Sequence, residues 1–172
     1  MRKLYKEFQP IGKAWLVELN NYNEVPFQRK TAEVKWSLGE IYEHLGNSTL
    51  DFHLKGLEAC LLAPKSGKKT WAGKMVFLKN NFQNKKMKAY LEDNYPPKQP
   101  ENIAEARDKM IRVLKQMDDC SCKITKKTEK QQSEHPILGF LTGKEWYRLV
   151  IFHFEYHRKN KDKIDNLLMS SR

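Results

Sequence analysis

The sequence predicts an all-α fold in which four amphipathic helices pack together as a four-helix bundle. Apolar residues recur at spacings of three and four in four segments, the pattern of helices with one buried face. Two Ser/Thr-x-x-Glu boxes mark helix starts, and no segment combines strand-like alternation with flanking turn signals. The 172 residues, 40% of them hydrophobic and 31% charged, are expected to form a single domain over residues 1–172.

The first helix is expected over residues 4–22. Its apolar positions share one face, and they are Leu4, Phe8, Ile11, Trp15, Leu19 and Tyr22. Pro10 either kinks this helix or opens its main part, because proline lacks a backbone N–H but fits the first helical turn.

The second helix is expected to begin at Ser37 and to reach Leu62. Ser37 and Glu40 have the spacing of a capping box, in which each side chain accepts a backbone N–H from the other residue. An apolar stripe continues to Leu62, where Pro64 disfavours the helical conformation of the residue before it. The second helix is therefore predicted to be long.

A third helix is expected over residues 101–119, after a cluster of prolines, and a fourth opens at Thr142 and ends near Met169. Thr142 and Glu145 repeat the capping-box spacing. Residues 64–100 are too many for a simple hairpin between the second and third helices. We therefore expect a long crossover there, with a short extra helix around residues 74–81.

The chain is strongly basic, with a formal net charge of +11, and this favours anionic partners. Residues 64–90 contain eight lysines, four aromatic residues and no acidic residue. Nucleic-acid binding is one interpretation of that composition. A solvated loop with its aromatic residues packed on the bundle is preferred, because lysine without arginine suits solvation.

Targeting signals and the number of cysteines indicate the cellular compartment in which the protein is expected. Residues 1–10 lack the apolar segment of a secretory signal, and no run of about 18 apolar residues is present, so we expect a cytoplasmic protein without a membrane partner. Three cysteines are an odd number in such a chain, which predicts reduced thiols. No role follows from the sequence for Cys120 and Cys122.

The sequence contains no Gly-rich phosphate loop and no GxSxG motif, which removes the enzyme classes that depend on them.

Two of the five histidines, His153 and His157, lie four residues apart on the apolar face of the fourth helix. Burying an imidazole without a hydrogen-bond partner costs about 1–3 kcal/mol, so each ring needs one. Ordinary buried hydrogen bonds are one explanation. A metal site is the other, because an i, i+4 pair offers two ligands from one helix.

His44 favours the metal site, because it lies at the border of the apolar stripe of the second helix. Three neutral imidazoles can hold a divalent ion and leave a coordination position open, as catalytic sites do. Glu40, one turn before His44, is a candidate general base or acceptor for a ligand, although the capping box explains it equally well.

Other polar residues have weaker cases. Ser48, Asn47 and Asp51 are candidates to line a pocket beside His44. His53 should point away from His44, and His135 precedes a proline in an expected loop, so both are predicted to be solvated.

Two stretches of the chain resemble the DinB-like superfamily, which includes bacillithiol-transferase-like proteins. The stretch "KWSLGEIYEHL" (residues 35–45) is similar to the start of the family's second helix, and "HPILGFLTGKEWYRLVIFHFEYHRKN" (residues 135–160) to its last loop and helix. The resemblance implies that His44, His153 and His157 ligate nickel, zinc or another divalent ion such as iron or manganese. It also implies an up-down-down-up bundle and frequent homodimers.

The resemblance further implies an activity. Characterised relatives transfer a low-molecular-weight thiol to an electrophile or use such a thiol as cofactor, and others are regarded as metal-dependent hydrolases. We therefore expect a metal-dependent enzyme that activates a thiol or water against a small molecule. The alternatives are a bundle that the metal only stabilises and, less favoured, a basic nucleic-acid-binding protein.

Overall fold

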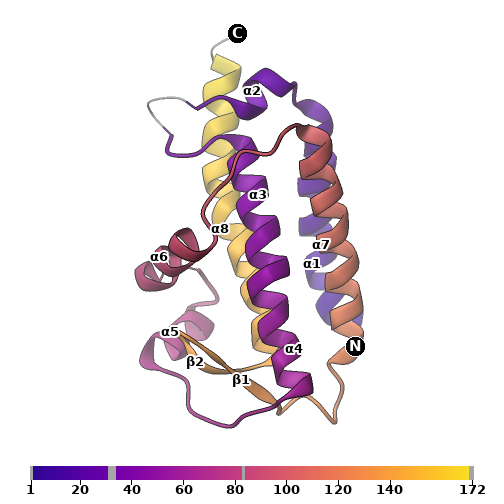
Figure 1. The fold of residues 1–172 in the computed structure, drawn as a ribbon, viewed down its shortest axis with the longest axis vertical. Helices are drawn as coiled ribbons and strands as arrows, with labels where there is room; N and C mark the ends of the chain where they lie inside the picture. The colour runs from indigo at the N-terminus through magenta and orange to yellow at the C-terminus, as the bar shows by residue number, and fades with distance from the viewer. Residues whose placement is uncertain (1, 31–33, 83, 171–172) are drawn as a thin grey trace.

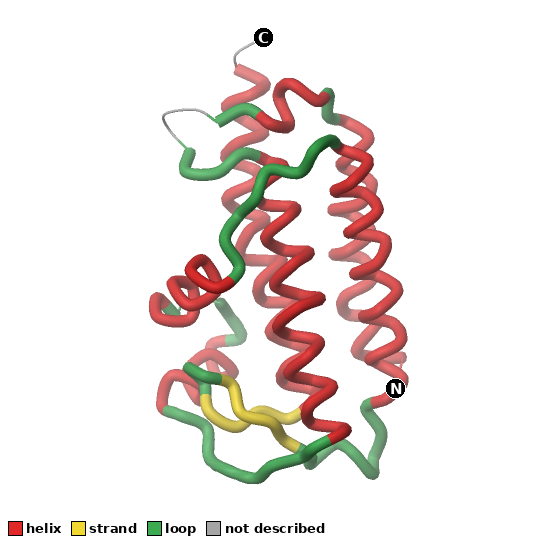
Figure 2. The backbone as a smooth tube through the Cα atoms, in the orientation of Figure 1, coloured by secondary structure: helices red, strands yellow, loops and turns green. Residues whose placement is uncertain are grey.

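The computed structural model describes residues 2–30, 34–82 and 84–170, and this part of the chain is mostly helical with one small two-stranded sheet. Figure 2 shows the sheet at one end of the long helices. None of the described helices combines the length and the apolar character needed to cross a membrane.

Four long helical segments lie side by side in Figure 1. They are α1 (Arg2–Glu18), the continuous run of α3 (Leu38–Ser48), η2 (Thr49–His53) and α4 (Leu54–Leu62), then α7 (Ile103–Lys123) and α8 (Gly143–Ser170). In that view α1 and α8 run upward, whereas α3–α4 and α7 run downward. The long connection from α4 to α7 therefore returns the chain to the upper end.

Shorter elements connect these helices. The 3-10 helix η1 (Leu19–Asn21) and α2 (Glu24–Gln28) follow α1, and α5 (Trp71–Lys79) and α6 (Lys85–Asn94) lie in the long connection. A short helix around residues 74–81 was expected and α5 occupies nearly that position, but α2 and α6 were not expected. Pro10 lies inside α1, which continues through it.

The sheet corrects the expectation that no strands form. Strands β1 (Gln132–His135) and β2 (Gly139–Thr142) pair antiparallel, with His135 opposite Gly139. Each strand has four residues, too few to show a clear alternation in the sequence. Gly139 has a φ of +75°, a conformation that side chains with a Cβ rarely adopt.

Both predicted capping boxes are present. The Ser37 N–H donates to Glu40 Oε2 at 2.9 Å, and the Glu40 N–H donates to Ser37 Oγ at 3.1 Å. At the start of α8, Thr142 and Glu145 make the same reciprocal bonds, at 2.9 and 3.3 Å. Local side-chain chemistry therefore determines where α3 and α8 begin.

The π-helical turn η2 overturns the prediction that His53 is solvated, because His53 is fully buried. In an unbroken α-helix a residue nine positions after His44 would point about 180° away from it. A π turn accommodates one additional residue, which reduces the offset to that of eight residues, about 80°. His53 therefore turns toward the interior and lies beside His153, with ring centroids 5.7 Å apart.

His135 was also predicted to be solvated, and it is buried with only 1% of its surface exposed. It ends β1, and its Nδ1 accepts the backbone N–H groups of Ile137 and Leu138 at 3.1 and 3.2 Å. Its ring stacks on Trp146, with centroids 4.9 Å apart. The imidazole thus closes the turn of the hairpin, and burial lowers its pKa to about 3.

This histidine should make the protein sensitive to acid. Between the ordinary pKa of about 6.5 and the folded value of about 3, only the unfolded chain binds the proton, so stability falls as pH falls through that range, by up to about 5 kcal/mol. The variant His135→Asn retains an oxygen that can accept the two turn N–H groups but does not titrate there. Urea unfolding with chelator present, from pH 7 downward, should give a shallower loss of stability for the variant. Equal slopes for the two proteins would contradict this role.

Candidate metal centre

Three imidazoles from two helices meet inside the bundle. His44 comes from α3, and His153 and His157 come from successive turns of α8. Each offers one ring nitrogen such that the three nitrogens lie within 4.8 Å of one another. All three side chains are buried, with 1 to 4% of their surface exposed. The structure therefore brings together the three histidines that the sequence selected.

The backbone determines the tautomer of His44. Its Nδ1 lies 2.9 Å from the carbonyl oxygen of Tyr95, which can only accept a hydrogen bond. The hydrogen of the neutral ring is therefore on Nδ1, and Nε2 keeps a free lone pair that points into the cluster.

Ser48 determines the tautomer of His153, as the Tyr95 carbonyl does for His44. The Ser48 hydroxyl donates to the carbonyl oxygen of His44 at 2.6 Å, so its oxygen is left to accept a hydrogen bond from Nδ1 of His153 at 3.3 Å. Nε2 of His153 then also keeps its lone pair. The sequence prediction for Ser48 as a pocket residue thus has a specific contact in the structure.

The two lone pairs face each other, because Nε2 of His44 and Nε2 of His153 are only 3.2 Å apart. Two acceptors at that separation repel unless a proton or a cation lies between them. Nitrogens that both bind one ion at about 2.0–2.1 Å, at a tetrahedral angle, would be roughly 3.3 Å apart. The chemistry of the three donors and the spacing of this pair therefore fit a divalent cation.

His157 completes the cluster. Its Nδ1 is buried and has no hydrogen-bond partner within the part of the chain that the structure describes. Burial lowers the pKa of His44, against the opposing effects of the Tyr95 carbonyl and Glu92. Burial also holds the pKa of His153 and of His157 well below the ordinary range, and the neighbouring imidazoles add to the effect. Neutral imidazoles are the form that binds metal.

Aromatic side chains wall the cluster. Trp36 stacks on His157 with centroids 5.5 Å apart and meets His44 edge-on at 4.8 Å. Phe82, from the long connection, stacks on His153 at 4.4 Å. Such walls exclude water and strengthen electrostatic interactions inside the site.

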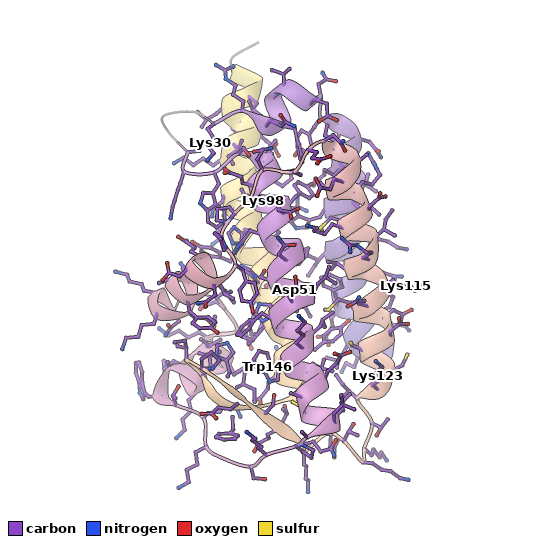
Figure 3. All side chains as sticks on the ribbon, viewed as in Figure 1. Lys30, Asp51, Lys98, Lys115, Lys123 and Trp146 are labelled. Carbon is purple, nitrogen blue, oxygen red and sulfur yellow. The ribbon has the colours of Figure 1, made fainter. Side chains whose placement is uncertain are left out.

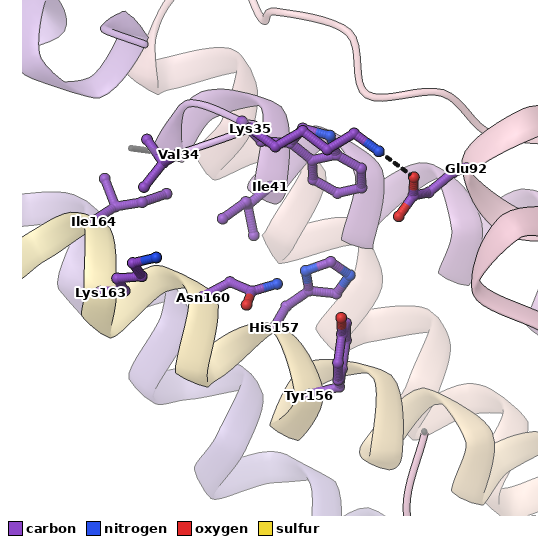
Figure 4. Close-up of a pocket in the computed structure, with 10 residues that line it drawn as sticks. Val34, Lys35, Ile41, Glu92, Tyr156, His157, Asn160, Lys163 and Ile164 are labelled. Carbon is purple, nitrogen blue, oxygen red and sulfur yellow. Dashed lines mark hydrogen bonds and ion pairs between the residues drawn. The ribbon is translucent and has the colours of Figure 1, made fainter. Parts of the chain in front are cut away.

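A pocket of about 200 Å³ leads to His157 from outside (Figure 4). Trp36, Tyr156 and Asn160 line it, and Lys35 forms an ion pair with Glu92 at 2.5 Å along its rim. The ammonium group of Lys88 lies 4.0 Å from the ring centroid of Tyr156. The pocket has room for a small molecule next to one of the three imidazoles.

The remaining predicted pocket residues are placed elsewhere. Both oxygens of Glu40 have partners, since Oε2 accepts the Ser37 N–H and Oε1 pairs with Lys30 at 2.7 Å. Asn47 bonds to Lys109 and Glu43, and Asp51 is exposed beside Lys55. The capping role accounts for Glu40 structurally, and a catalytic role for it stays a prediction.

Sequence reasoning did not select Tyr95, Trp36 or Phe82. A backbone carbonyl carries no residue-specific signal, so Tyr95 could not have been found. Trp36 directly precedes the capping box of the helix that contains His44. An aromatic residue at that position was a signal from which a wall of the site could have been predicted. Phe82 lies in the long connection, whose path only packing determines.

Comparison with protein-family models relates most of the chain to one family. A family model described as "Protein of unknown function (DUF1569)" matches residues 14–163, a range that includes all three histidines of the cluster. None of the curated proteins matches the chain.

Proposed function

We propose a function for this chain from its own residues, because the chain belongs to the DUF1569 family, whose description assigns none. The proposal is a metal-dependent enzyme in which His44, His153 and His157 hold one divalent ion. The observation that carries it is the 3.2 Å approach of two imidazole nitrogens that both present lone pairs.

The fold supports placing this family within the DinB-like superfamily. The directions of the four long helical segments, with the two middle segments parallel, and the long connection before α7 agree with an up-down-down-up bundle. Two ligands four residues apart on the last helix and one on the second long helix also agree with that resemblance. A homodimer and a cytoplasmic location remain predictions from the sequence.

The ligand set favours particular metals. Three imidazoles suit zinc, nickel, copper or iron better than calcium or magnesium, which prefer oxygen ligands. An ion held there supplies Lewis acidity, which eases the deprotonation of a thiol or a water molecule at its open position. Zinc and nickel are the ions that we propose first.

The reaction that we propose is transfer of a low-molecular-weight thiol to a small electrophile. The thiol loses its proton to a base, its sulfur forms a bond to the electrophilic carbon, and the leaving group departs with the bonding electrons. The pocket beside His157 admits the small molecules, and Trp36 and Phe82 shield the imidazoles from bulk water. Hydrolysis, with water in place of the thiol, is the variant of this proposal.

An activity assay with the purified protein tests it. Metal-loaded protein should accelerate the disappearance of free thiol when a thiol such as cysteine or glutathione is mixed with a haloaromatic electrophile, and chelation should remove the acceleration. The competing function is a metal that only stabilises the bundle, which the bridging of α3 and α8 by the ligands favours. In that case chelation lowers the melting temperature but no thiol or ester assay responds to metal.

Glu40 can be tested separately as the proposed base. Glutamine at this position still accepts the Ser37 N–H, so Glu40→Gln should change stability by less than about 1 kcal/mol. If Glu40 takes the proton, the same change should lower activity by about 10²–10⁴-fold at unchanged metal content. Ser37→Ala is the matched control, because it weakens the cap and leaves the carboxylate in place. Similar activity losses in the two variants would assign Glu40 to capping alone.

A further inference from the structure

The outer face of α5 carries an apolar stripe bordered by lysines. At about 100° per residue, Trp71, Met75 and Leu78 lie within about 60° of one another, with Lys74 on one side and Lys79 on the other. Trp71 is 76% exposed and Leu78 is 75% exposed. We call these five residues the α5 face.

Hydrogen bonds and a close backbone contact attach the opposite side and both ends of α5 to the rest of the fold. Thr70 caps the helix by accepting the Gly73 N–H at 3.0 Å, and its own N–H donates to the Leu138 carbonyl at 3.0 Å. A Cβ on Gly73 would lie 2.2 Å from that carbonyl oxygen, so only glycine permits this approach to the hairpin. At the other end Arg148 of α8 donates to Asn80 at 3.1 Å. The α5 face is therefore presented outward on a supported helix, at the edge of the molecule in Figure 1.

The charge around this face is mostly positive. Residues 64–90 contain eight lysines and no acidic residue, and Lys65, Lys68, Lys74 and Lys79 are exposed. Two acidic side chains of α8 lie in this part of the fold: Glu145 pairs with Lys69 at 2.8 Å, and Glu155 lines a pocket together with Asn80 and Lys159. The ligand of this surface must therefore combine negative charge with an apolar layer.

We propose that the α5 face docks on an anionic phospholipid surface. Tryptophan, leucine and methionine enter the boundary between headgroups and acyl chains, while lysines stay with the headgroup phosphates. The apolar contact of a nine-residue helix is small, so the lysines supply much of the affinity. Single-stranded nucleic acid fits less well, because Phe77 and Tyr90 are only partly exposed, Phe82 is buried and aliphatic side chains offer no stacking platform.

The sequence favoured a solvated loop here and no membrane partner. That preference assumed that the aromatic residues of this segment pack on the bundle. In the structure, Trp71 and Leu78 are instead mostly exposed. The proposal does not depend on the metal site, and every variant below should keep the metal content of the wild-type protein.

Vesicle binding of the full chain tests the proposal. Wild-type protein should cosediment at low ionic strength with vesicles of phosphatidylcholine plus phosphatidylserine, and not with phosphatidylcholine alone. Tryptophan emission should shift to the blue and be quenched by brominated lipids. That signal reports on Trp71, since Trp15, Trp36 and Trp146 are at most 8% exposed. Trp71→Ser/Leu78→Ser should weaken binding at least about tenfold, whereas Val25→Ser, at an equally exposed apolar residue of α2, should not.

A charge-matched pair of variants separates local from general attraction. Lys74→Gln/Lys79→Gln should weaken binding by about fivefold per lysine at low salt. Lys115→Gln/Lys123→Gln removes the same charge from α7, at the right-hand edge of the molecule in Figure 3 and opposite α5, and should have little effect. Four results overturn the proposal: no vesicle binding; equal losses in both lysine variants; a gel shift with single-stranded DNA that depends on Trp71 without vesicle binding; or Trp71-dependent self-association without vesicle binding.

Discussion

His153→Ala is expected to remove the bound metal and, with it, the stabilisation that the metal provides. Wild-type protein should contain about one divalent ion per chain, and loss of one of three imidazole ligands should weaken binding by at least about 100-fold. Metal at a thousandfold excess over its dissociation constant stabilises the folded state by about 4 kcal/mol. In a chain of this size that corresponds to about 10 °C in melting temperature. Elemental analysis and thermal unfolding with and without chelator measure both effects.

The control for this experiment is His135→Asn, which alters a buried histidine outside the cluster and should keep the ion. Chelator should lower the melting temperature of the wild type and of this control, and leave His153→Ala unchanged. An equal amount of divalent ion in His153→Ala and in the wild type would refute the metal centre. Retention of the ion with no thiol transfer or hydrolysis would instead leave the metal centre standing and remove the enzymatic proposal.

Glu43→Leu is expected to destabilise the protein by about 3–5 kcal/mol, because it leaves a buried lysine without its counter-charge. Glu43 and Lys109 are 4 and 8% exposed and form an ion pair between α3 and α7. Asn47 bonds to both partners, at 3.0 and 2.9 Å. Gly46 makes room for the lysine stem, since a Cβ there would lie 2.5 Å from Cδ of Lys109. Urea unfolding of the metal-free protein measures the loss.

The double variant Glu43→Leu/Lys109→Met should recover most of that stability, because the charge left by the single change is replaced by an apolar side chain of similar length. Asp51→Asn is the matched control, since it breaks the exposed pair with Lys55 and should change stability by less than about 1 kcal/mol. If the double variant is as unstable as Glu43→Leu, packing and not the unpaired charge accounts for the loss.

The elements that sequence reasoning located well are those whose signals are local. Ser37 and Thr142 were expected to begin helices, and each makes its reciprocal bonds with the glutamate three residues later. The bounds of α7 were shifted by a few residues, because Asn102 caps it and the helix runs on to Lys123. The hairpin was not predicted from the sequence, because its strands have only four residues each.

In the candidate site, too, local patterns predicted some features and only packing determined the others. Spacing along two amphipathic helices selected His44, His153 and His157, since residues on one face of a helix share a direction whatever the rest of the chain does. The sequence could not show that His53 turns inward, because that depends on one π turn within a long helix. Ser48 was among the pocket candidates, but its bond to His153 requires α3 and α8 to pack at the observed register.

The sequence by itself determined the four long helical segments, the caps of α3 and α8 and the selection of the three histidines, because periodicity and capping are properties of neighbouring residues. Tertiary structure alone decided which nitrogen His44 and His153 present, through the carbonyl of Tyr95 and the hydroxyl of Ser48. It also decided that Phe82 covers the cluster while Trp71 faces outward from the same basic segment. The physical reason is that the path of a long connection depends on packing contacts between residues far apart in the chain, which no local pattern encodes.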